Sequence, residues 1–514
     1  MRAMQKLKLK KRRLIESRHF IVKIVFSLFY SPMKPITLTA KFFRLPLAFR
    51  TLILSGLVVA LVACSGDGSQ SVEFAWVQFG PDGYQVRAIT SRAACPIALV
   101  RTAQSKTESK IPLSTRALPS GDDFPNRVCE LNLPKNTQAV TIAEYGLDMT
   151  VKDQDIKKFA ILGDTGCRIK VKDGSSDIQA CNDLDEWPFP TVSSSIATKE
   201  FDAIIHTGDI LYRESPCPEG NKGCAGSPYG YGYSGFEADF FDPAIGLLRT
   251  RPWIFVRGNH EKCGRAGIAW TRYFSPWPIA DGQCREFEQP YTLDFGTVQL
   301  LVMDTSASHD LPPLVPGQIE HYRGQFEELA KVVDKDRSWL LAHHPVWAFR
   351  IRGTDSGEPA PASQTLIAAI VNDQGDQILE TQAVIAGHVH NFTLFDYGDS
   401  MPQLIIGNAG ALLDLAFQQD QVGLKIGERT IKRLTSFSDF GFSLAELQQQ
   451  RGWEFIQFDK DGNPYGVSCT LKERTCVEAG GNPVPLVCVD QQEKLLHALC
   501  GSLVIYSVSY IYPF

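Results

Sequence analysis

Five short polar motifs occur along the middle of the chain, each directly after an apolar run. They contain carboxylate, amide, phenol and imidazole side chains, which are groups that bind metal ions and transfer protons. The motifs are Gly163-Asp164-Thr165-Gly166, Gly208-Asp209-Ile210-Leu211-Tyr212, Gly258-Asn259-His260-Glu261, His343-His344-Pro345 and Gly387-His388-Val389-His390. Any single motif of this kind is more often a turn or a satisfied core group than a site. The hypothesis therefore depends on the whole set.

The elements that must position these motifs are buried strands. Six runs are apolar rather than alternating, with Gln299 as their one polar residue: 159–162, 203–205, 253–256, 298–303, 340–342 and 383–385. This pattern is typical of central strands that are covered on both faces, so it predicts a layered α/β domain. Helical stretches at 317–334 and 360–371 agree with αβ alternation. Ligand sites form beyond the carboxyl ends of such strands, so we expect the motifs to converge.

In this order the motifs resemble those of the calcineurin-like metallophosphoesterase superfamily and, within it, the purple acid phosphatases, including the tartrate-resistant type. The resemblance covers roughly residues 156–400. Most of the superfamily has a histidine ligand in the first motif, where this chain has Gly166. Tyr212, three residues after Asp209, stands where purple acid phosphatases place a metal-binding tyrosinate. The resemblance implies a layered αββα sandwich.

Carried over position by position, the resemblance implies a dinuclear metal centre. The implied ligands of the first ion are Asp164, Asp209, Tyr212 and His390. The implied ligands of the second ion are Asp209, Asn259, His343 and His388, so that Asp209 bridges the two ions. Phenolate and carboxylate suit Fe(III), whereas amide and imidazole suit Zn, Fe(II) or Mn(II).

The implied reaction is the hydrolysis of a small phosphate ester by a metal-activated hydroxide, as in an acid phosphatase acting on monoesters. His260 is the expected catalytic residue, because it would protonate the leaving group or grip the phosphate. Arg168 and His344 are candidate phosphate contacts. One alternative is a phosphodiesterase or nucleotide pyrophosphatase. Another is a lipid-anchored binding or scaffold lipoprotein with a vestigial centre.

The N-terminal segment has the character of an export signal. Basic residues up to Arg50 precede an uncharged run, 51–63, that ends in Leu61-Val62-Ala63-Cys64. This resembles a bacterial lipoprotein signal with its lipobox, and it implies that residues 1–63 are a leader and that Cys64 is acylated. The run is shorter than the roughly 20 residues of a spanning helix. The alternative is a short anchor helix with a coincidental cysteine.

We interpret Met33 as the true start, because it gives a signal of more ordinary length. The expected location is the cell envelope, with the lipid anchor in the periplasm-facing outer membrane. Residues 64–514 carry 39 Lys and Arg against 56 Asp and Glu, a net charge of −17. A surface this acidic repels polyanions, so nucleic acid is not the expected partner.

The other twelve cysteines predict disulfides, because their number is even and the chain is expected to be exported. Their positions are Cys95, Cys129, Cys167, Cys181, Cys217, Cys224, Cys263, Cys284, Cys469, Cys476, Cys488 and Cys500. Pairing neighbours in order is one connectivity among many. No CxxC spacing supports a zinc cluster instead.

The expected organisation has four parts. After the leader, residues 64–155 contain short β-type runs separated by turn residues and predict a small β-sandwich-like domain. The catalytic domain is expected at 156–470, followed by a cysteine-containing extension at 471–514. Within the catalytic domain, 217–235 and 264–290 are predicted to be long loops. The first of them follows the second motif directly, so we expect it to lie over the site.

Overall fold

The computed structural model describes residues 71–478, apart from 106, 153, 173–174, 280–282, 352–358, 399–400 and 473–474. The expected leader 1–63, Cys64 and most of the expected extension 471–514 therefore lie outside the described residues. No helix among the residues that the structure describes has the length and apolar character needed to cross a bilayer.

One mixed sheet of eleven strands carries the first three motifs. Its order is β28-β27-β26-β25-β9-β12-β13-β1-β2-β6-β5. The strands are β1 (Val72–Gly80), β2 (Gly83–Thr90), β5 (Ser114–Ala117), β6 (Arg127–Asn132), β9 (Lys158–Leu162), β12 (Ala203–His206), β13 (Trp253–Phe255), β25 (Gly441–Gln448), β26 (Gly452–Asp459), β27 (Pro464–Thr470) and β28 (Thr475–Glu478). Because β9, β12 and β13 are parallel neighbours, the motifs that follow them emerge at one edge of the sheet.

A second sheet, of seven strands, carries the remaining two motifs. Its order is β14-β15-β16-β19-β21-β20-β24. The strands are β14 (Tyr291–Asp294), β15 (Gln299–Met303), β16 (Ser338–Ala342), β19 (Ala383–Ala386), β20 (Phe392–Asp396), β21 (Gln403–Ile406) and β24 (Arg433–Phe437). Strands β15, β16, β19 and β21 are parallel to one another, so the motifs after β16 and β19 also share one edge.

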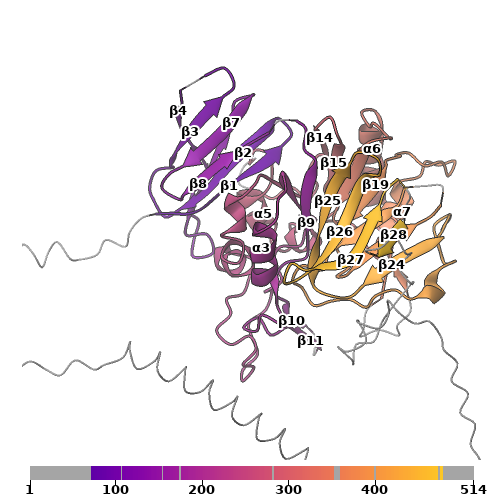
Figure 1. The fold of residues 1–514 in the computed structure, drawn as a ribbon. Helices are drawn as coiled ribbons and strands as arrows, with labels where there is room; N and C mark the ends of the chain where they lie inside the picture. Colours follow the sequence, from indigo (N-terminus) through magenta and orange to yellow (C-terminus); the bar gives the residue numbers. More distant parts are fainter. Residues whose placement is uncertain are drawn as a thin grey trace, which may run out of the picture. The chain divides into compact units, whose positions relative to one another are not determined.

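The helices are short and few among the described residues. The α-helices are α3 (Phe189–Ala197), α4 (Tyr233–Phe236), α5 (Gly267–Tyr273), α6 (Pro316–Ala330) and α7 (Gln364–Ala369). Single helical turns of other types are η1 (Glu237–Phe241), η2 (Leu247–Arg249), η3 (Asn259–Glu261) and η4 (Gln419–Gln421). In Figure 1, α6 and α7 lie by the second sheet, and α3 and α5 lie by the first.

The two sheets pack face to face, with helices outside each. In β15, Leu300 and Val302 belong to the core between the sheets, whereas Leu301 and Met303 belong to the core under α6 and α7. Such alternation means that both faces of the strand are buried, as the non-alternating apolar runs predicted. Trp339 of β16 contacts Phe159 of the first sheet across the interface, with ring centroids 5.7 Å apart. The expected αββα sandwich is confirmed.

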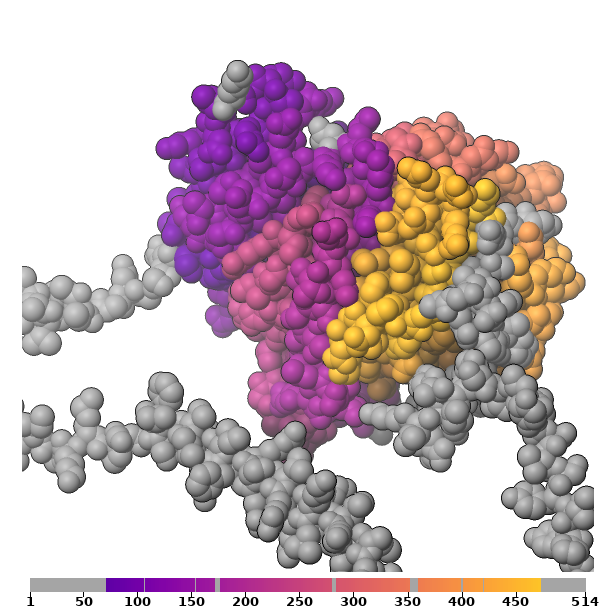
Figure 2. Space-filling view, viewed as in Figure 1, coloured from indigo at the N-terminus to yellow at the C-terminus, as the bar shows by residue number. Residues whose placement is uncertain are grey.

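The N-terminal region is all-β, as expected, but its strands divide between two sheets. β4 (Ser109–Pro112), β3 (Ile97–Thr102), β7 (Thr137–Ile142) and β8 (Leu147–Thr150) form a separate four-stranded sheet. β1, β2, β6 and β5 instead extend the large sheet, because β1 pairs in parallel with β13 at Gln78 and Trp253. In Figure 2 this region (indigo) and the C-terminal strands (yellow) occupy different parts of one face. The domain boundary at 155 stays a prediction.

Three small hairpins complete the described strands. They are β10 (Ile169–Lys172) with β11 (Ser175–Ile178), β17 (Phe349–Arg350) with β18 (Ala360–Pro361), and β22 (Lys425–Ile426) with β23 (Arg429–Thr430). The first of these hairpins follows the first motif directly, so it extends from the edge of the sheet where the motifs gather.

Two sequence predictions about helices and loops are wrong. The segment 264–290 is not one loop, because α5 lies within it and buries Trp270 and Tyr273, three residues apart, in the core. The predicted helix 360–371 is shorter than expected. Its helical part begins after Ser363, whose hydroxyl caps it by accepting from the Leu366 N–H at 3.1 Å.

Four disulfides join cysteines that are neighbours in the sequence. They are Cys95–Cys129, Cys167–Cys181, Cys217–Cys224 and Cys263–Cys284. The prediction of disulfides is confirmed for these eight cysteines. Disulfides persist in oxidising compartments, so the chain belongs to an exported environment.

Candidate metal centre

The five motifs meet at the carboxyl ends of β9, β12, β13, β16 and β19. Two groups of side chains there have donor atoms within 4.8 Å of one another: Asp164 with Asp209 and His343, and His343 with His344 and His388. All five of these residues are buried. A concentration of buried carboxylates and imidazoles is costly unless the charges are compensated, so the arrangement indicates a cation site.

Tyr212 lies between the other side chains predicted to hold the first ion. Its hydroxyl oxygen is 2.9 Å from Asp164 Oδ1, 2.9 Å from Asp209 Oδ2 and 2.8 Å from His390 Nε2. His390 Nε2 is also 3.4 Å from Asp164 Oδ1. The four side chains predicted to hold the first ion therefore converge, although they come from three different strand ends. A single phenolic proton cannot satisfy three acceptors at once.

Asp209 joins this group to the second one. Its Oδ2 atom, which contacts Tyr212, lies 3.2 Å from His343 Nε2. The Asn259 Oδ1 atom is 3.1 Å from His343 Nε2 and 3.0 Å from His388 Nδ1. The four side chains predicted to hold the second ion thus also converge. Asp209 occupies the shared position that the bridging role requires.

A backbone carbonyl or a carboxylate fixes the tautomer of each of the three predicted histidine ligands. His343 donates from Nδ1 to the Thr207 carbonyl at 2.9 Å, and His390 donates from Nδ1 to the Leu412 carbonyl at 2.6 Å. His388 donates from Nε2 to Asp310, whose two oxygens lie 3.1 and 3.2 Å away. In each ring the other nitrogen faces the converging side chains and would offer its lone pair to a bound cation. This is the usual way in which proteins orient histidine ligands for a metal.

The Asn259 amide has two possible orientations. Without a cation, hydrogen bonding favours the orientation in which its nitrogen faces Asp209 and the two imidazoles and its oxygen faces Arg265. A cation among these groups would favour the reverse, since it attracts the oxygen. The carboxylate, amide and imidazole groups that converge here are ligand types that fit a metal ion.

The pKa values of the central groups also indicate a cation site. Burial, together with the carboxylates of Asp164 and Asp209, raises the pKa of the Tyr212 phenol well above its usual value. Burial opposes charge on His343, but Asp209 and Asp164 outweigh it and raise the pKa of that imidazole to about 9. The carboxylates contribute to both shifts, and a bound cation would neutralise their negative charge.

The backbone at the centre is held in an uncommon conformation. Asp164, Asp209 and His388 have φ of 55°, 56° and 70°, and they are three of the five non-glycine residues with positive φ in the part of the chain that the structure describes. Such strain collects at functional sites, where the surrounding structure imposes it. Gly258 is required here for space, because a Cβ atom would lie 2.1 Å from the Asp209 nitrogen.

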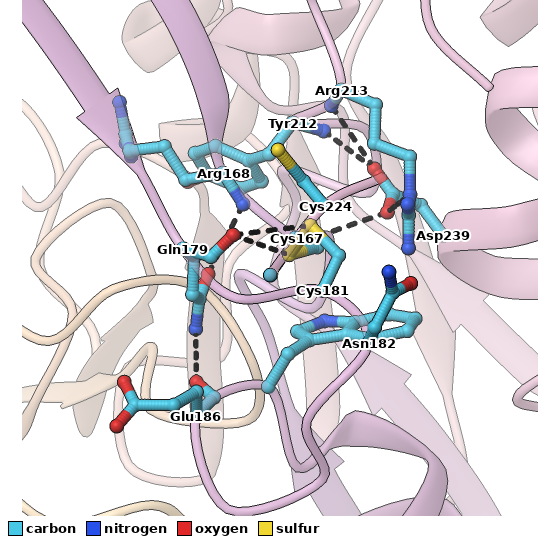
Figure 3. The surroundings of a disulfide bond; sticks show 12 residues. Cys167, Arg168, Gln179, Cys181, Asn182, Glu186, Tyr212, Arg213, Cys224 and Asp239 are labelled. Atoms are coloured by element: carbon cyan, nitrogen blue, oxygen red, sulfur yellow. Dashed lines mark hydrogen bonds and ion pairs between the residues drawn. A yellow bond between two sulfur atoms is a disulfide. The ribbon is translucent and has the colours of Figure 1, made fainter. Parts of the chain in front are cut away.

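Two buried carboxylates hold the loop between Asp209 and Tyr212. Glu261 accepts from the backbone N–H groups of Ile210 and Leu211 at 2.9 and 3.1 Å. Asp239 accepts from the Tyr212 N–H at 2.8 Å and from the Cys167 N–H at 3.0 Å, as drawn in Figure 3. These contacts fix the direction in which the phenol points. No local pattern pointed to Asp239, because it lies 27 residues beyond the motif that it supports.

The centre opens into a cavity of about 630 Å³. His260, His344 and Arg168 line it together with five of the predicted ligands, which are Asp209, Tyr212, Asn259, His388 and His390. The loop 217–235 contributes no residue to the lining among the described residues. Tyr233 of that loop is buried instead, and its hydroxyl contacts Glu73 and Glu237, both at 2.8 Å. The expectation that this loop covers the site is therefore wrong.

His260 packs against the central phenol. Its ring centroid is 3.9 Å from that of Tyr212, and its Nδ1 atom lies 2.9 Å from the Leu211 carbonyl and 2.9 Å from Glu214. Since both partners accept, Nδ1 carries the proton and Nε2 is the acceptor atom. Burial is the main cause that lowers the pKa of His260, to about 3. The resting imidazole is therefore neutral.

His344 lies beside His388, one of the side chains predicted to hold the second ion. Its ring centroid is 4.1 Å from that of His388, and its Nδ1 atom is buried without a hydrogen-bond partner among the described residues. Burial, reinforced by the neighbouring His388, holds the pKa of His344 well below its usual value. Arg168 places its guanidinium 4.7 Å from the centre of the Tyr212 ring. Both candidate phosphate contacts thus border the cavity.

Asp310, Arg350 and Asp414 are supporting residues that sequence reasoning missed. Besides orienting His388, Asp310 lies 3.7 Å from His344 Nε2. Arg350 contacts Asp414 at 3.1 Å, and Asp414 accepts from the His390 N–H at 3.1 Å. None of the three belongs to a motif, so only the folded chain brings them to the site.

One family of known proteins matches the part of the chain that carries the motifs. Residues 157–392 match the family model of the calcineurin-like phosphoesterases. These residues form a calcineurin-like phosphoesterase domain, and the chain is a phosphoester hydrolase. No curated protein matches the chain. Among solved structures, the purple acid phosphatase PPD1 from yellow lupin (Lupinus luteus) seeds is similar at 16% identity, with a TM-score of 0.49, over 77% of this chain and 73% of that one.

Proposed function

We propose that the chain is a phosphomonoesterase of the purple acid phosphatase type, with a dinuclear metal centre. One observation carries the proposal: the Tyr212 hydroxyl lies within 2.9 Å of Asp164, Asp209 and His390. A phenol in that position compensates for the histidine that Gly166 replaces. Phenolate with two carboxylates is a hard donor set that suits Fe(III), and the Asn259, His343 and His388 set suits Zn, Fe(II) or Mn(II).

The charge of the centre favours an anionic phosphate ester. Ionised Asp164, Asp209 and Tyr212 contribute three negative charges, so a trivalent and a divalent ion together leave an excess of about two positive charges. When bound, such ions supply Lewis acidity that lowers the pKa of water and neutralises charge on phosphoryl oxygens. The contribution of the chain is to hold the ligands in place and to shape the cavity.

His260 is the residue that we assign to proton transfer. At acid pH a monoester monoanion still carries one proton. His260 lines the cavity, where it would assist the transfer of that proton from the phosphate to the departing oxygen. Its pKa of about 3 means that the ring is neutral before and after the transfer. Arg168 and His344 would orient the phosphate from the cavity walls.

The test is hydrolysis of p-nitrophenyl phosphate and of its bis ester by metal-loaded protein. We expect faster hydrolysis of the monoester, with an acidic pH optimum. An optimum above about pH 8 would argue against the trivalent ion, because a trivalent ion acidifies bound water more than zinc does. Faster hydrolysis of the bis ester would indicate a phosphodiesterase. A protein that binds no metal and cleaves neither ester would indicate a scaffold.

Tyr212→Phe is the informative variant, with Tyr229→Phe as its matched control. Tyr229 is exposed and does not line the cavity. Loss of the phenolic oxygen should reduce metal retention and lower kcat/KM by more than about 10-fold, whereas the control should behave as wild type. A Tyr212→Phe protein with full metal content and activity would contradict the assignment of the phenol.

We further propose that Cys64 carries the lipid anchor and that the mature protein faces the periplasm from the outer membrane. The support is the sequence Leu61-Val62-Ala63-Cys64 at the end of an apolar run. Metabolic labelling with a fatty-acid analogue should mark the wild type and not Cys64→Ser. Equal labelling of both would exclude anchoring at this cysteine.

A further inference from the structure

A second cavity, separate from the one at the metal centre, lies between β5 and α5. Its volume is about 400 Å³, which is within the range of small-molecule binding sites. One wall is formed by β5 and the residue that follows it, and the facing wall is formed mainly by α5. None of the lining residues also lines the cavity at the metal centre. The ligand of this second cavity is therefore a separate question from the chemistry of the metal centre.

Half of the lining residues of the second cavity are aliphatic. They are Ala117, Leu118, Ile268 and Ile279. Leu118 and Ile268 come from the two facing walls, and they are 60% and 47% exposed, so the cavity opens to solvent between them. Large aliphatic side chains that stay exposed around a concave surface gain stability when an apolar group covers them. This part of the cavity therefore favours a hydrocarbon ligand or the hydrocarbon part of a larger one.

Arg272 of α5 brings a buried positive charge to the same cavity. The residue is only 8% exposed, and no carboxylate forms an ion pair with it in the part of the chain that the structure describes. Its Nη2 atom donates to the carbonyls of Leu118 and Asn126 at 2.7 and 3.3 Å, and its Nε atom is buried without a hydrogen-bond partner among the same residues. The guanidinium also lies 4.7 Å from the centre of the Phe124 ring. Carbonyls and a ring offer only partial charges, so the charge of Arg272 is not fully compensated.

The ionisable neighbours of Arg272 do not supply the missing negative charge. Burial lowers the pKa of Arg272, and the group that opposes this effect is the phenol of Tyr273. Burial in turn raises the pKa of Tyr273 above its usual value, so this phenol is neutral at physiological pH. The carboxylate of Glu73 instead accepts from Asn126 Nδ2 at 2.6 Å and from the Tyr233 hydroxyl at 2.8 Å. A negative group that compensates Arg272 must therefore come from a ligand.

Arg116, from the facing wall, adds to the positive excess of the cavity. Its Nη1 atom lies 2.6 Å from Glu130 Oε2, but the same carboxylate oxygen lies 3.1 Å from Nη1 of the buried Arg87. Two guanidinium groups thus share one carboxylate. An excess of positive charge beside a cavity favours an anionic group there. The second cavity therefore combines an aliphatic mouth with a cationic wall.

We propose that the second cavity binds a free aliphatic monocarboxylate, with the carboxylate beside Arg272 and the hydrocarbon chain against Leu118 and Ile268. A single negative charge matches the one guanidinium that has no carboxylate partner. A phosphate dianion fits less well, because its second charge would lose hydration beside aliphatic side chains without gaining a partner. The inference goes beyond the proposed function, since the two cavities share no lining residue.

The test is a calorimetric titration of the whole protein with three probes. Octanoate has both the carboxylate and the hydrocarbon chain, octan-1-ol has the chain without the charge, and acetate has the charge without the chain. Octanoate should bind more tightly than either comparison compound by about 10-fold or more, because it alone makes both kinds of contact. If octanoate binds no more tightly than octan-1-ol or acetate, the proposal is overturned.

Two variants locate the binding site. Ile268→Asp places a negative charge at the mouth of the cavity and should weaken octanoate binding by about 10-fold. Its matched control is Ile245→Asp, which changes an isoleucine that is 41% exposed and lines neither cavity. Arg272→Gln should reduce the affinity for octanoate to that for octan-1-ol, with thermal unfolding as the check that the variant is folded. Since Ile268 is exposed, the comparison of the two Asp variants decides even if Arg272→Gln does not fold. Equal octanoate binding by Ile268→Asp and Ile245→Asp would overturn the proposal.

Discussion

Two buried polar clusters in this protein show opposite kinds of balance. At the junction between the N-terminal strands and the segment that follows α5, Arg116 donates to Glu130 at 2.6 Å and to the carbonyls of Thr271, Ser275 and Trp277 at 2.7 to 3.0 Å. Every nitrogen of that guanidinium has an acceptor. At the motif edge, oxygens and imidazole lone pairs face one another around Asp209. The Arg116 guanidinium is therefore fully paired within the protein, whereas the groups around Asp209 need a cation.

The difference separates a structural network from a functional one. A satisfied buried network stabilises the fold and requires no partner, whereas an unbalanced one persists only if something else compensates it. By this criterion the acceptor-rich centre of the metal-site cavity is unbalanced, and it suits metal ions.

The largest expected effect is that of Asp209→Asn. This change removes the carboxylate that belongs to both predicted ligand sets. Loss of a residue that only supports a ligand costs up to roughly 100-fold, so the fall in metal affinity and activity should be larger than that here. Stability of the metal-free protein should fall little, because the crowding of acceptors is relieved. Metal titration and steady-state kinetics would measure this. If the Asp209→Asn variant retains activity within about 10-fold of wild type, the bridging role is contradicted.

Arg116→Met should lower stability and leave metal binding unchanged, which is the reverse of the effect expected for Asp209→Asn. Removing this buried guanidinium leaves the Thr271 and Trp277 carbonyls unpaired and leaves Glu130 with Arg87 alone, at a cost of about 3 kcal/mol in the free energy of unfolding. Metal content and kcat of the folded fraction should be unchanged. Denaturant unfolding gives the first quantity, with the exposed Arg101→Met as control. If the variant is as stable as wild type, the junction does not have the structural role assigned to it.

Asp310→Asn tests whether the orientation of His388 matters. The carboxamide still fills the space, but it accepts the His388 proton more weakly than the carboxylate does. We expect a loss of about 10- to 100-fold in affinity for the second ion or in activity. Asp373→Asn, in an exposed ion pair with Arg323, is the control. Matched behaviour of the two variants would show that the contact with His388 is incidental.

The smallest effect is expected far from the cavity, at Asp202. Burial opposes ionisation, but hydrogen bonds from Lys152 and from the backbone N–H groups of Lys157 and Lys158 outweigh it, so the pKa is lowered from 3.8. Because folding lowers the pKa of Asp202, its ionised side chain stabilises the fold at pH values above the pKa of the unfolded chain. This stabilisation is lost as the pH falls. Asp202→Asn should therefore cost about 1 kcal/mol at neutral pH and progressively less as the pH falls below the ordinary value of 3.8. A pH-independent loss would indicate that ionisation is not involved.

The sequence predicted most of what lies on the strands that carry the motifs. Non-alternating apolar runs identified β9, β12, β15, β16 and β19, since burial on both faces leaves a strong local pattern. The seven predicted metal ligands meet because parallel strands end at one edge. Their role as ligands stays a prediction.

What the sequence could not predict depends on contacts between distant segments. Asp310 and Asp239 support the centre from outside any motif. The parallel pairing of Gln78 with Trp253 joins segments 175 residues apart, and no local pattern records it. The helix α5 was missed because it has only seven residues, too few for the apolar period to be distinguished from a loop.

The most direct test of the central claim is the number of metal ions bound per chain. Elemental analysis of purified, metal-reconstituted protein should give two ions per wild-type chain, with fewer in Asp209→Asn and Tyr212→Phe. If the protein hydrolyses phosphate esters at full rate while retaining no metal after exhaustive chelation, the account of the centre would be wrong.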